Sequence, residues 1–379
     1  MFTFLVILSL VVIVAISVFI YFKMAPQIGA TIEGDRLARV EKSQNFRNGI
    51  FMNTVATDMT MPPFSVLVKI LTQGSRLDPD TTLVTWPFDK AAFQGLEDKE
   101  TSVTWFGHSS FLLKVNGSVF LMDPVFSERA SMFSFMGPER FDYSHTMEVD
   151  MLPTVDAVIL SHDHYDHLDY KTIMALKEKV KKYYVPLGVG AHLESWGIPT
   201  SRIVELDWWD EVQHDGEIKL IFTPSRHFSG RTFGDRFKTL WGAWVIQSRE
   251  QNIFFGGDSG YFEGFKEIGE KYGPFDFAML ECGQYSIYWP DIHMAPELTA
   301  QAGEDLKAKR VMPIHWGKFT LSIHHWTEPA ERFIAASKEK NYEVILPIIG
   351  ETFILGKSHH HLWWREGYNQ SGSHPEEAP

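Results

Sequence analysis

Short apolar runs alternate with longer amphipathic segments from about residue 99 to residue 356. Runs rich in β-branched and aromatic residues, such as those at 118–123, 156–161 and 252–258, are typical of buried strands. The segments at 170–182 and 296–309 have apolar side chains at helical spacing, which predicts helices between the strands. The alternation predicts an α/β domain in which helices cover layers of strands.

The beginning of the chain has a different pattern. Residues 3–22, TFLVILSLVVIVAISVFIYF, contain no charged side chain, and a helix of this length spans a hydrocarbon core of roughly 30 Å. We therefore expect residues 1–24 to form an uncleaved single-pass membrane anchor. The alternative is a cleaved signal peptide, which normally has a basic segment before a shorter apolar core. Positive charge begins only after the span, at Lys23, which predicts that the bulk of the protein is cytoplasmic.

Two further segments lack a clean periodicity. Residues 25–98 are interrupted by Pro, Gly, Asn and Thr, and we expect them to form a connecting segment packed on the main domain. The C-terminal residues are polar and end in acidic side chains, which predicts a solvated tail that includes histidines 359–361. The predicted organisation is therefore an anchor at 1–24, a connection at 25–98, an α/β domain at 99–356 and a tail at 357–379.

Composition narrows the class of protein. The 379 residues are 44% hydrophobic and 22% charged, which is typical of a globular protein. A formal net charge of −13 argues against a nucleic-acid-binding protein, which usually has a basic face. A single cysteine, Cys282, excludes a disulfide framework within the chain.

A dense group of polar residues follows the apolar run at 155–160. The chain continues as HDHYDH, which contains His162, His164, Asp166 and His167. Neighbouring side chains of a strand alternate between its two faces, so a loop is needed to turn these residues towards one point. Imidazole and carboxylate groups are suitable ligands for Zn²⁺, Fe or Mn. The group therefore predicts a metal site on the loop after the strand.

Three more candidate ligands stand in a similar setting. His227, Asp258 and His315 each come shortly after an apolar, strand-like run. Binding sites in sheet-based folds gather at the ends of strands, so we expect these residues to converge with the histidine-rich loop.

The ligand order H-x-H-x-D-H, followed by a distant His, Asp and His, resembles that of the metallo-β-lactamase superfamily. The resemblance implies an αββα sandwich with a dinuclear site between its two sheets, here preceded by one N-terminal transmembrane helix. Within the superfamily, segments such as DPVFSERAS, FTPSRHF and PIHWGKF resemble N-acyl-phosphatidylethanolamine-hydrolysing phospholipases D. This closer resemblance covers residues 103–320, and its segments are more specific than the histidine motif alone.

The resemblance also implies how the ligands are divided between two zinc ions or similar transition-metal ions. Seven ligands are too many for one tetrahedral zinc and suit two neighbouring ions. A water held between the ions would lose a proton near neutral pH and become the nucleophile, so no serine or cysteine nucleophile is needed. The implied ligands are His162, His164 and His227 for one ion, Asp166, His167 and His315 for the other, and Asp258 as the bridge.

Two histidines outside this set are candidates for roles beside the metals. The resemblance places His293 near the substrate phosphate or the leaving group, although Ile292 stands where the animal enzymes have a polar Gln. His108 lies at the edge of the site, forms a hydrogen bond behind a ligand, or has a structural role. Together with Asp166, these two histidines are the residues that we expect to take part in catalysis.

The resemblance implies a phosphodiesterase that hydrolyses N-acyl-phosphatidylethanolamine to N-acylethanolamine and phosphatidate. A membrane anchor agrees with this phospholipid substrate, because it holds the site at the lipid surface. Two alternatives remain, namely a hydrolase or lactonase of the same fold with a soluble phosphorylated or cyclic substrate, and a metal-binding scaffold without activity. An apolar channel would favour the lipid, and a small basic cup would favour a sugar phosphate. The resemblance also suggests a homodimer, and no nucleic-acid partner is expected.

Overall fold

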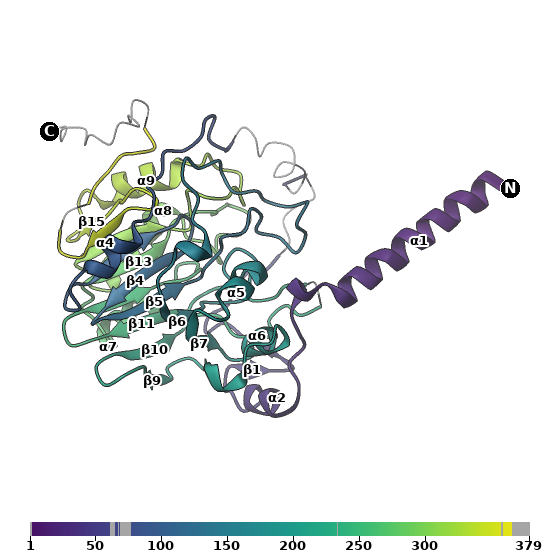
Figure 1. Ribbon diagram of the computed structural model, residues 1–379, viewed down its shortest axis with the longest axis horizontal. Coiled ribbons are helices and arrows are strands. Elements are labelled where there is room, and N and C mark those ends of the chain that lie inside the picture. Colours follow the sequence, from purple (N-terminus) through teal and green to yellow (C-terminus); the bar gives the residue numbers. More distant parts are fainter. Residues whose placement is uncertain are drawn as a thin grey trace.

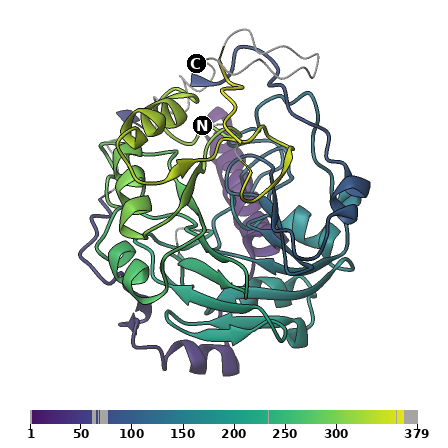
Figure 2. The same cartoon turned by 90° about the vertical axis from the view of Figure 1, so that its left-hand side faces the viewer.

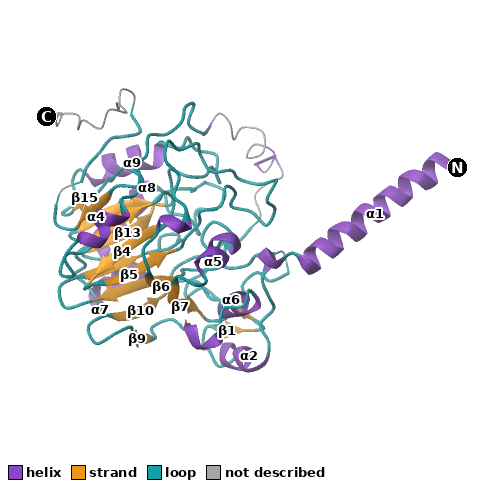
Figure 3. Ribbon diagram, in the orientation of Figure 1, coloured by secondary structure: helices purple, strands orange, loops and turns teal. Residues whose placement is uncertain are grey.

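The computed structural model describes residues 2–60, 65–66, 68, 77–232, 234–357 and 359–365. Within these residues, two seven-stranded sheets are stacked face to face and helices cover the outer faces (Figures 1 and 3). This arrangement confirms the predicted α/β sandwich. A separate two-stranded hairpin, β1 (Phe46–Arg47) and β2 (Ile50–Phe51), belongs to the N-terminal segment.

The first sheet has the order β16-β3-β4-β5-β6-β7-β8. Its pairing is antiparallel from β16 to β5 and parallel from β5 to β8. The parallel strands are covered on both faces, which explains why their sequences are nearly continuous apolar runs. The strands are β3 (Ser102–Trp105), β4 (Phe111–Val115), β5 (Ser118–Met122), β6 (Val155–Ile159), β7 (Val180–Pro186), β8 (Ile203–Leu206) and β16 (Thr352–Ile354).

The second sheet repeats this plan with the order β15-β14-β13-β12-β11-β10-β9. Strands β9 to β12 pair antiparallel, and β12 to β15 pair parallel. The strands are β9 (Glu211–Gln213), β10 (Lys219–Thr223), β11 (Ala243–Gln247), β12 (Asn252–Phe255), β13 (Phe277–Glu281), β14 (Arg310–Ile314) and β15 (Glu343–Val344).

Aromatic side chains join the two sheets across the central core. The rings of Phe111 in β4 and Phe255 in β12 meet edge to face with centroids 6.2 Å apart. The indole Nε1 of Trp244 in β11 donates a hydrogen bond of 2.8 Å to the carbonyl oxygen of Leu160, directly after β6. These contacts set the spacing of the strand ends, from which the candidate ligands project.

Helices cover each sheet on the side away from this core. Ile173 of α5 and Leu193 of α6 pack on the first sheet, and Phe265 of α7 and Phe333 of α9 pack on the second. The turned view shows the green C-terminal helices and the teal helices on opposite sides of the sandwich (Figure 2). The helices are α2 (Gly34–Val40), α4 (Lys90–Gly95), α5 (Tyr170–Leu176), α6 (Gly190–Ser195), α7 (Gly264–Lys271), α8 (Pro296–Asp305) and α9 (Glu328–Ser337).

The N-terminal helix α1 (Phe2–Met24) projects away from the body (Figure 1). Its apolar side chains are exposed, with Phe4 at 68% and Ile7 at 57%. At its base, the Tyr21 hydroxyl donates a hydrogen bond of 2.6 Å to the Met132 carbonyl oxygen. Among the described residues, no helix combines the length and the apolar character that crossing a bilayer requires. The predicted transmembrane anchor over residues 1–24 is therefore not supported.

The C-terminal segment differs from the predicted solvated tail as far as residue 365, where the description ends. Trp363 and Trp364 are only 4% and 8% exposed, because both rings pack against Trp316. Residues 366–379 of the predicted tail lie outside the described residues.

Candidate metal centre

The loop after β6 carries the histidine-rich motif to the place where other strands of the sandwich end. His227 follows β10, Asp258 follows β12 and His315 follows β14. The structure brings all of the predicted ligands together in two neighbouring groups, and within each group the ligand atoms lie within 4.8 Å of one another. The groups are His162, His164, His227 and Asp258, and then His108, Asp166, His167 and His315.

In the first group, three imidazole nitrogens face a common point. Nδ1 of His164 lies 2.8 Å from Nε2 of His162 and 3.3 Å from Nε2 of His227. Zn–N bonds of about 2.0–2.1 Å in a tetrahedron place ligand atoms roughly 3.3 Å apart. The spacing of the three nitrogens is therefore of the size that one tetrahedral ion requires.

Asp258 lies between the two groups. Its Oδ2 is 3.7 Å from His227 Nε2 in the first group and 3.2 Å from His167 Nε2 in the second. Its Oδ1 is 3.0 Å from Nδ1 of His315. Asp258 therefore occupies the position expected of a carboxylate that bridges two ions.

Hydrogen bonds to the outer ring nitrogens orient the ligand histidines. The ring nitrogens that face the centre of the site are left available for a metal ion. His167 Nδ1 is hydrogen-bonded to Asp123 Oδ2 at 2.7 Å, and His227 Nδ1 donates to the Ile292 carbonyl oxygen at 2.9 Å. Metal-binding histidines commonly have such a partner on the ring nitrogen that faces away from the ion. His167 Nε2 and Asp258 Oδ1 are buried and make no hydrogen bond within the described part of the chain. A buried imidazole nitrogen and a buried carboxylate oxygen that lack a hydrogen bond are suitable metal ligands.

Burial sets the charge of the site. Burial lowers the pKa of His164 to about 4, so this imidazole is neutral and able to coordinate a metal at pH 7. Burial raises the pKa of Asp258 to about 7 in the metal-free protein. A bound cation favours the ionised carboxylate, so metal binding is coupled to loss of a proton from Asp258.

His108 lies beside this centre and contacts two parts of it. Its Nε2 is 2.8 Å from Asp166 Oδ2, and its backbone carbonyl oxygen accepts a hydrogen bond of 3.0 Å from the His315 backbone N–H. His108 and His315 have φ angles of 56° and 69°, which are unfavourable for residues other than glycine. Of the three roles predicted for His108, the contact with Asp166 favours a hydrogen bond that orients a metal ligand.

His293 also lies beside the centre. Its Nδ1 is 2.8 Å from Glu281 Oε1, and its ring centroid is 5.3 Å from that of His315. His293 also lines a cavity of about 240 Å³ whose floor includes His164, Asp166 and Asp258. The rest of the lining combines apolar or aromatic side chains with polar ones and one arginine: Met59, Phe228, Trp289, Ile292, Leu321, Asp58, Thr60, Gln284, His315 and Arg236.

Comparison with known proteins agrees with this geometry. Residues 119–316 match the family described as the beta-lactamase superfamily domain. The chain belongs to the metallo-β-lactamase superfamily. An uncharacterised protein of Mycobacterium tuberculosis (strain ATCC 25618 / H37Rv) is 40% identical over 331 residues, which cover 86% of this chain and 88% of the relative.

Two further matches have names that indicate an activity. N-acyl-phosphatidylethanolamine-hydrolyzing phospholipase D 1 of Caenorhabditis elegans is 33% identical over 242 residues, which cover 60% of this chain and 67% of the relative. Igni18, a metallo hydrolase from the archaeon Ignicoccus hospitalis, superposes with a TM-score of 0.53 and 20% identity over 67% of this chain and 97% of that one. Igni18 supports the fold alone, and the comparisons together identify a metal-dependent hydrolase of the metallo-β-lactamase fold.

Acidic residues outside the predicted site form hydrogen bonds with the site and its loops. Asp123, directly after β5, accepts hydrogen bonds of 2.7 Å from the Ser161 backbone N–H and from His167. Glu281, at the end of β13, accepts a hydrogen bond from the Ser259 backbone N–H and contacts His293. Both carboxylates come at the end of an apolar run, which is the same signal that selected Asp258.

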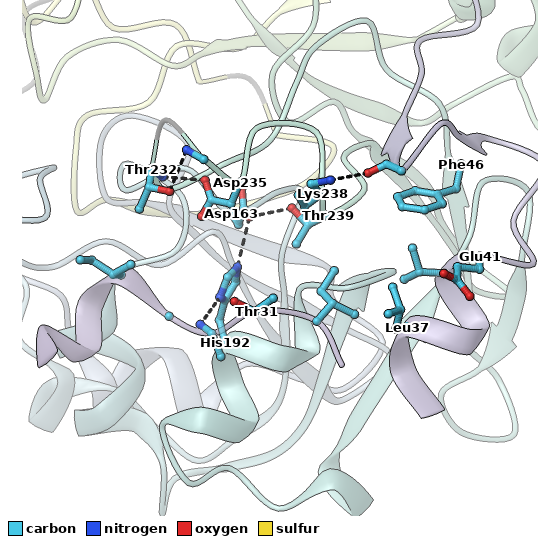
Figure 4. Close-up of a pocket in the computed structure, with 17 residues that line it drawn as sticks. Thr31, Leu37, Glu41, Phe46, Asp163, His192, Thr232, Asp235, Lys238 and Thr239 are labelled. Carbon is cyan, nitrogen blue, oxygen red and sulfur yellow. Dashed lines mark hydrogen bonds and ion pairs between the residues drawn. The ribbon is translucent and has the colours of Figure 1, made fainter. Parts of the chain in front are cut away.

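A third carboxylate, Asp163, anchors the histidine-rich loop. It accepts hydrogen bonds of 2.7 Å from the Gly230 backbone N–H and 2.6 Å from the Thr239 hydroxyl, and its Oδ2 is 3.2 Å from His192 Nε2. Figure 4 shows Asp163, His192 and Thr239 beside a second cavity of about 670 Å³. This larger cavity contains none of the predicted ligands, so we assign the chemistry to the smaller one.

Replacing Asp123 with asparagine tests the support of His167. The amide keeps the shape of the carboxylate but removes the charge that orients the ring, so we expect metal affinity and kcat/KM to fall about 10- to 100-fold. Metal retention against a competing chelator, measured beside activity, checks this result. The matched control is Asp98→Asn, because the Asp98 side chain is 84% exposed. An Asp123→Asn variant with the same metal affinity as the control would contradict the assigned role.

Proposed function

We propose that the protein is a zinc-dependent phosphodiesterase of the phospholipase D type. It hydrolyses N-acyl-phosphatidylethanolamine to N-acylethanolamine and phosphatidate. The observation that carries the proposal is the cavity of about 240 Å³, whose lining combines predicted ligands with apolar and aromatic side chains and with Arg236. The similarity of this chain to a relative that is named for this activity supports the same reaction.

The side chains of the cavity suit a phosphodiester with an apolar part. Two bound Zn²⁺ ions would supply Lewis-acid activation of the phosphodiester and of water. Arg236 provides a planar donor that suits phosphate oxygens. His293, oriented by Glu281, is positioned to exchange a proton with the leaving group. Phe228, Trp289 and Leu321 contact the apolar part of the substrate and exclude water from the reacting bond.

Exposed apolar side chains support a substrate presented at a lipid surface. Ile287 is 85% exposed and lies in the loop that contributes Trp289 to the cavity wall. Phe135 and Met136 are 74% and 54% exposed, close in the chain to the residues that contact the base of α1. These residues and the exposed apolar side chains of α1 are suited to contact with a lipid surface.

The direct test is a substrate panel assayed with purified, metal-quantified protein. The panel contains N-acyl-phosphatidylethanolamine, phosphatidylethanolamine, phosphatidylcholine, a water-soluble phosphodiester, a sugar phosphate and a lactone. We expect the highest kcat/KM for N-acyl-phosphatidylethanolamine, with N-acylethanolamine and phosphatidate as products. Faster turnover of the sugar phosphate or the lactone would overturn the lipid assignment in favour of a hydrolase with a soluble substrate.

Deletion of residues 2–20 tests the contribution of α1. This deletion leaves Tyr21 and its contact with Met132 in place. We expect the rate on N-acyl-phosphatidylethanolamine in vesicles to fall about tenfold or more, because the helix no longer concentrates the enzyme at the lipid surface. The rate on a water-soluble phosphodiester should stay within about twofold, because α1 contributes no group to the candidate centre. Equal losses on both substrates would show that α1 is needed for folding rather than for membrane contact.

A further inference from the structure

Glu351, His359 and His361 form a compact polar group in the C-terminal part of the described chain. Their potential ligand atoms lie within 4.8 Å of one another. None of the three belongs to the candidate metal centre or lines the cavity above it. Glu351 is only 7% exposed, so this group is not a set of solvated side chains.

The backbone places the two histidines on one side of an extended segment. The backbone N–H of Leu346 donates to the His359 carbonyl oxygen at 2.7 Å, and the His361 N–H donates to the Leu346 carbonyl oxygen at 2.9 Å. Residues i and i+2 of an extended segment point in the same direction, whereas the residue between them points away. His359 and His361 are accordingly half-buried beside Glu351, and His360 is exposed.

The histidine–carboxylate distances in the group are longer than those of ordinary hydrogen bonds, which are about 2.7–3.2 Å. Nδ1 of His359 lies 3.5 Å from Glu351 Oε1, and Nε2 of His361 lies 3.6 Å from Glu351 Oε2. The same distances are close to the roughly 3.3 Å between neighbouring ligand atoms around tetrahedral zinc.

The charge of the group also favours a cation. Glu351 is only 7% exposed, and the Ile348 backbone N–H donates a hydrogen bond of 3.1 Å to its Oε2. A carboxylate with so little access to water is stabilised by a nearby positive partner. A divalent cation held between the carboxylate and two imidazoles supplies that partner.

We propose that Glu351, His359 and His361 bind a divalent transition-metal ion of the zinc class, with water in the fourth position. Two imidazoles and one carboxylate form a ligand set that suits this class of ion. The ion joins Glu351, directly before β16, to the C-terminal segment and so fastens that segment to the body. This site is independent of the proposed substrate and of the predicted catalytic ions.

The fastened segment packs behind the candidate centre. Trp363 stacks on Trp316 with ring centroids 5.6 Å apart, and Trp364 meets the same ring edge to face at 5.2 Å. Trp316 directly follows the predicted ligand His315. The metal site therefore stabilises the aromatic packing that supports this ligand.

Metal analysis of the full-length protein tests the proposal. We expect His359→Gln with His361→Gln to lose about one equivalent of zinc per chain relative to the wild type. Glu351→Gln, which preserves the shape of the side chain, should lose the same equivalent. His360→Gln is the matched control, because it changes the exposed neighbour and should keep the full metal content. Full metal content in both site variants, or an equal loss in the control, would overturn the proposal.

Thermal unfolding gives a second readout. Because an ion that binds only the folded state stabilises it, added zinc should raise the Tm of the wild type and of His360→Gln by about 2 °C or more. The increase should be smaller in Glu351→Gln, in which only the candidate metal centre remains to bind zinc. An identical zinc response in Glu351→Gln and His360→Gln would show that the three residues form an ion-pair group without a metal.

Discussion

Replacement of both His162 and His164 by alanine is expected to abolish hydrolysis and to remove about one metal ion per chain. Their inner nitrogens lie 2.8 Å apart, and the pair supplies two of the three imidazoles of the first ligand group. Loss of Lewis-acid stabilisation is worth several kcal/mol, so kcat/KM should fall by about 10³-fold or more. Metal analysis and steady-state kinetics on the same preparation measure both effects.

The double variant should remain folded, because neither side chain belongs to the apolar core between the sheets. Circular dichroism and the unfolding midpoint check this expectation. The control is the pair His145→Ala and His360→Ala, which changes two exposed histidines and should preserve metal and activity. Activity in wild-type protein that contains no transition metal would refute the metal-dependent mechanism.

Asp258→Asn should have the second-largest effect. The Asp258 carboxylate lies 3.2 Å from His167 Nε2 and 3.7 Å from His227 Nε2, so it contacts both ligand groups. Asparagine keeps the shape but removes the negative charge that two cations would share. We expect kcat/KM to fall by more than the roughly 100-fold that is typical of the loss of a supporting residue.

The comparison variants for Asp258→Asn are His108→Gln and His293→Gln. The His108 ring is hydrogen-bonded to Asp166 and the His293 ring to Glu281, and neither imidazole carries the negative charge by which Asp258 would hold two cations. Kinetics and metal content should place both variants between the wild type and Asp258→Asn. Near-normal turnover in Asp258→Asn would show that the assigned ligand set is wrong.

The main features of the fold could be predicted because they depend on local patterns. Strands that are covered on both faces need apolar side chains at nearly every position, as in β6 and β13, and such runs are visible in the sequence. Candidate ligands could also be recognised in the sequence directly after these runs. A strand that ends at the edge of the core leaves the next side chains able to bind a metal ion. The convergence of His162, Asp258 and His315 follows from that rule.

The roles of supporting residues could not be predicted in the same way. His108 and Asp166 are far apart in the sequence, and their contact depends on the positions of two separate loops. Asp123 has the same sequence signal as Asp258, but only its distance from His167 distinguishes a support from a ligand. The sequence predicts a solvated tail at histidines 359 and 361, because no local pattern shows that Trp363 is buried against Trp316.

The sequence by itself determined the α/β class, the family resemblance and the set of candidate ligands, because strand periodicity and ligand chemistry are properties of short segments. Only the tertiary structure decided which ligands share a group, which residues support them, and which cavity they face. Those relations depend on the stacking of the two sheets, through contacts such as that of Phe111 with Phe255. Distances between the ends of strands from different sheets are set by packing across the core, and no local pattern contains them.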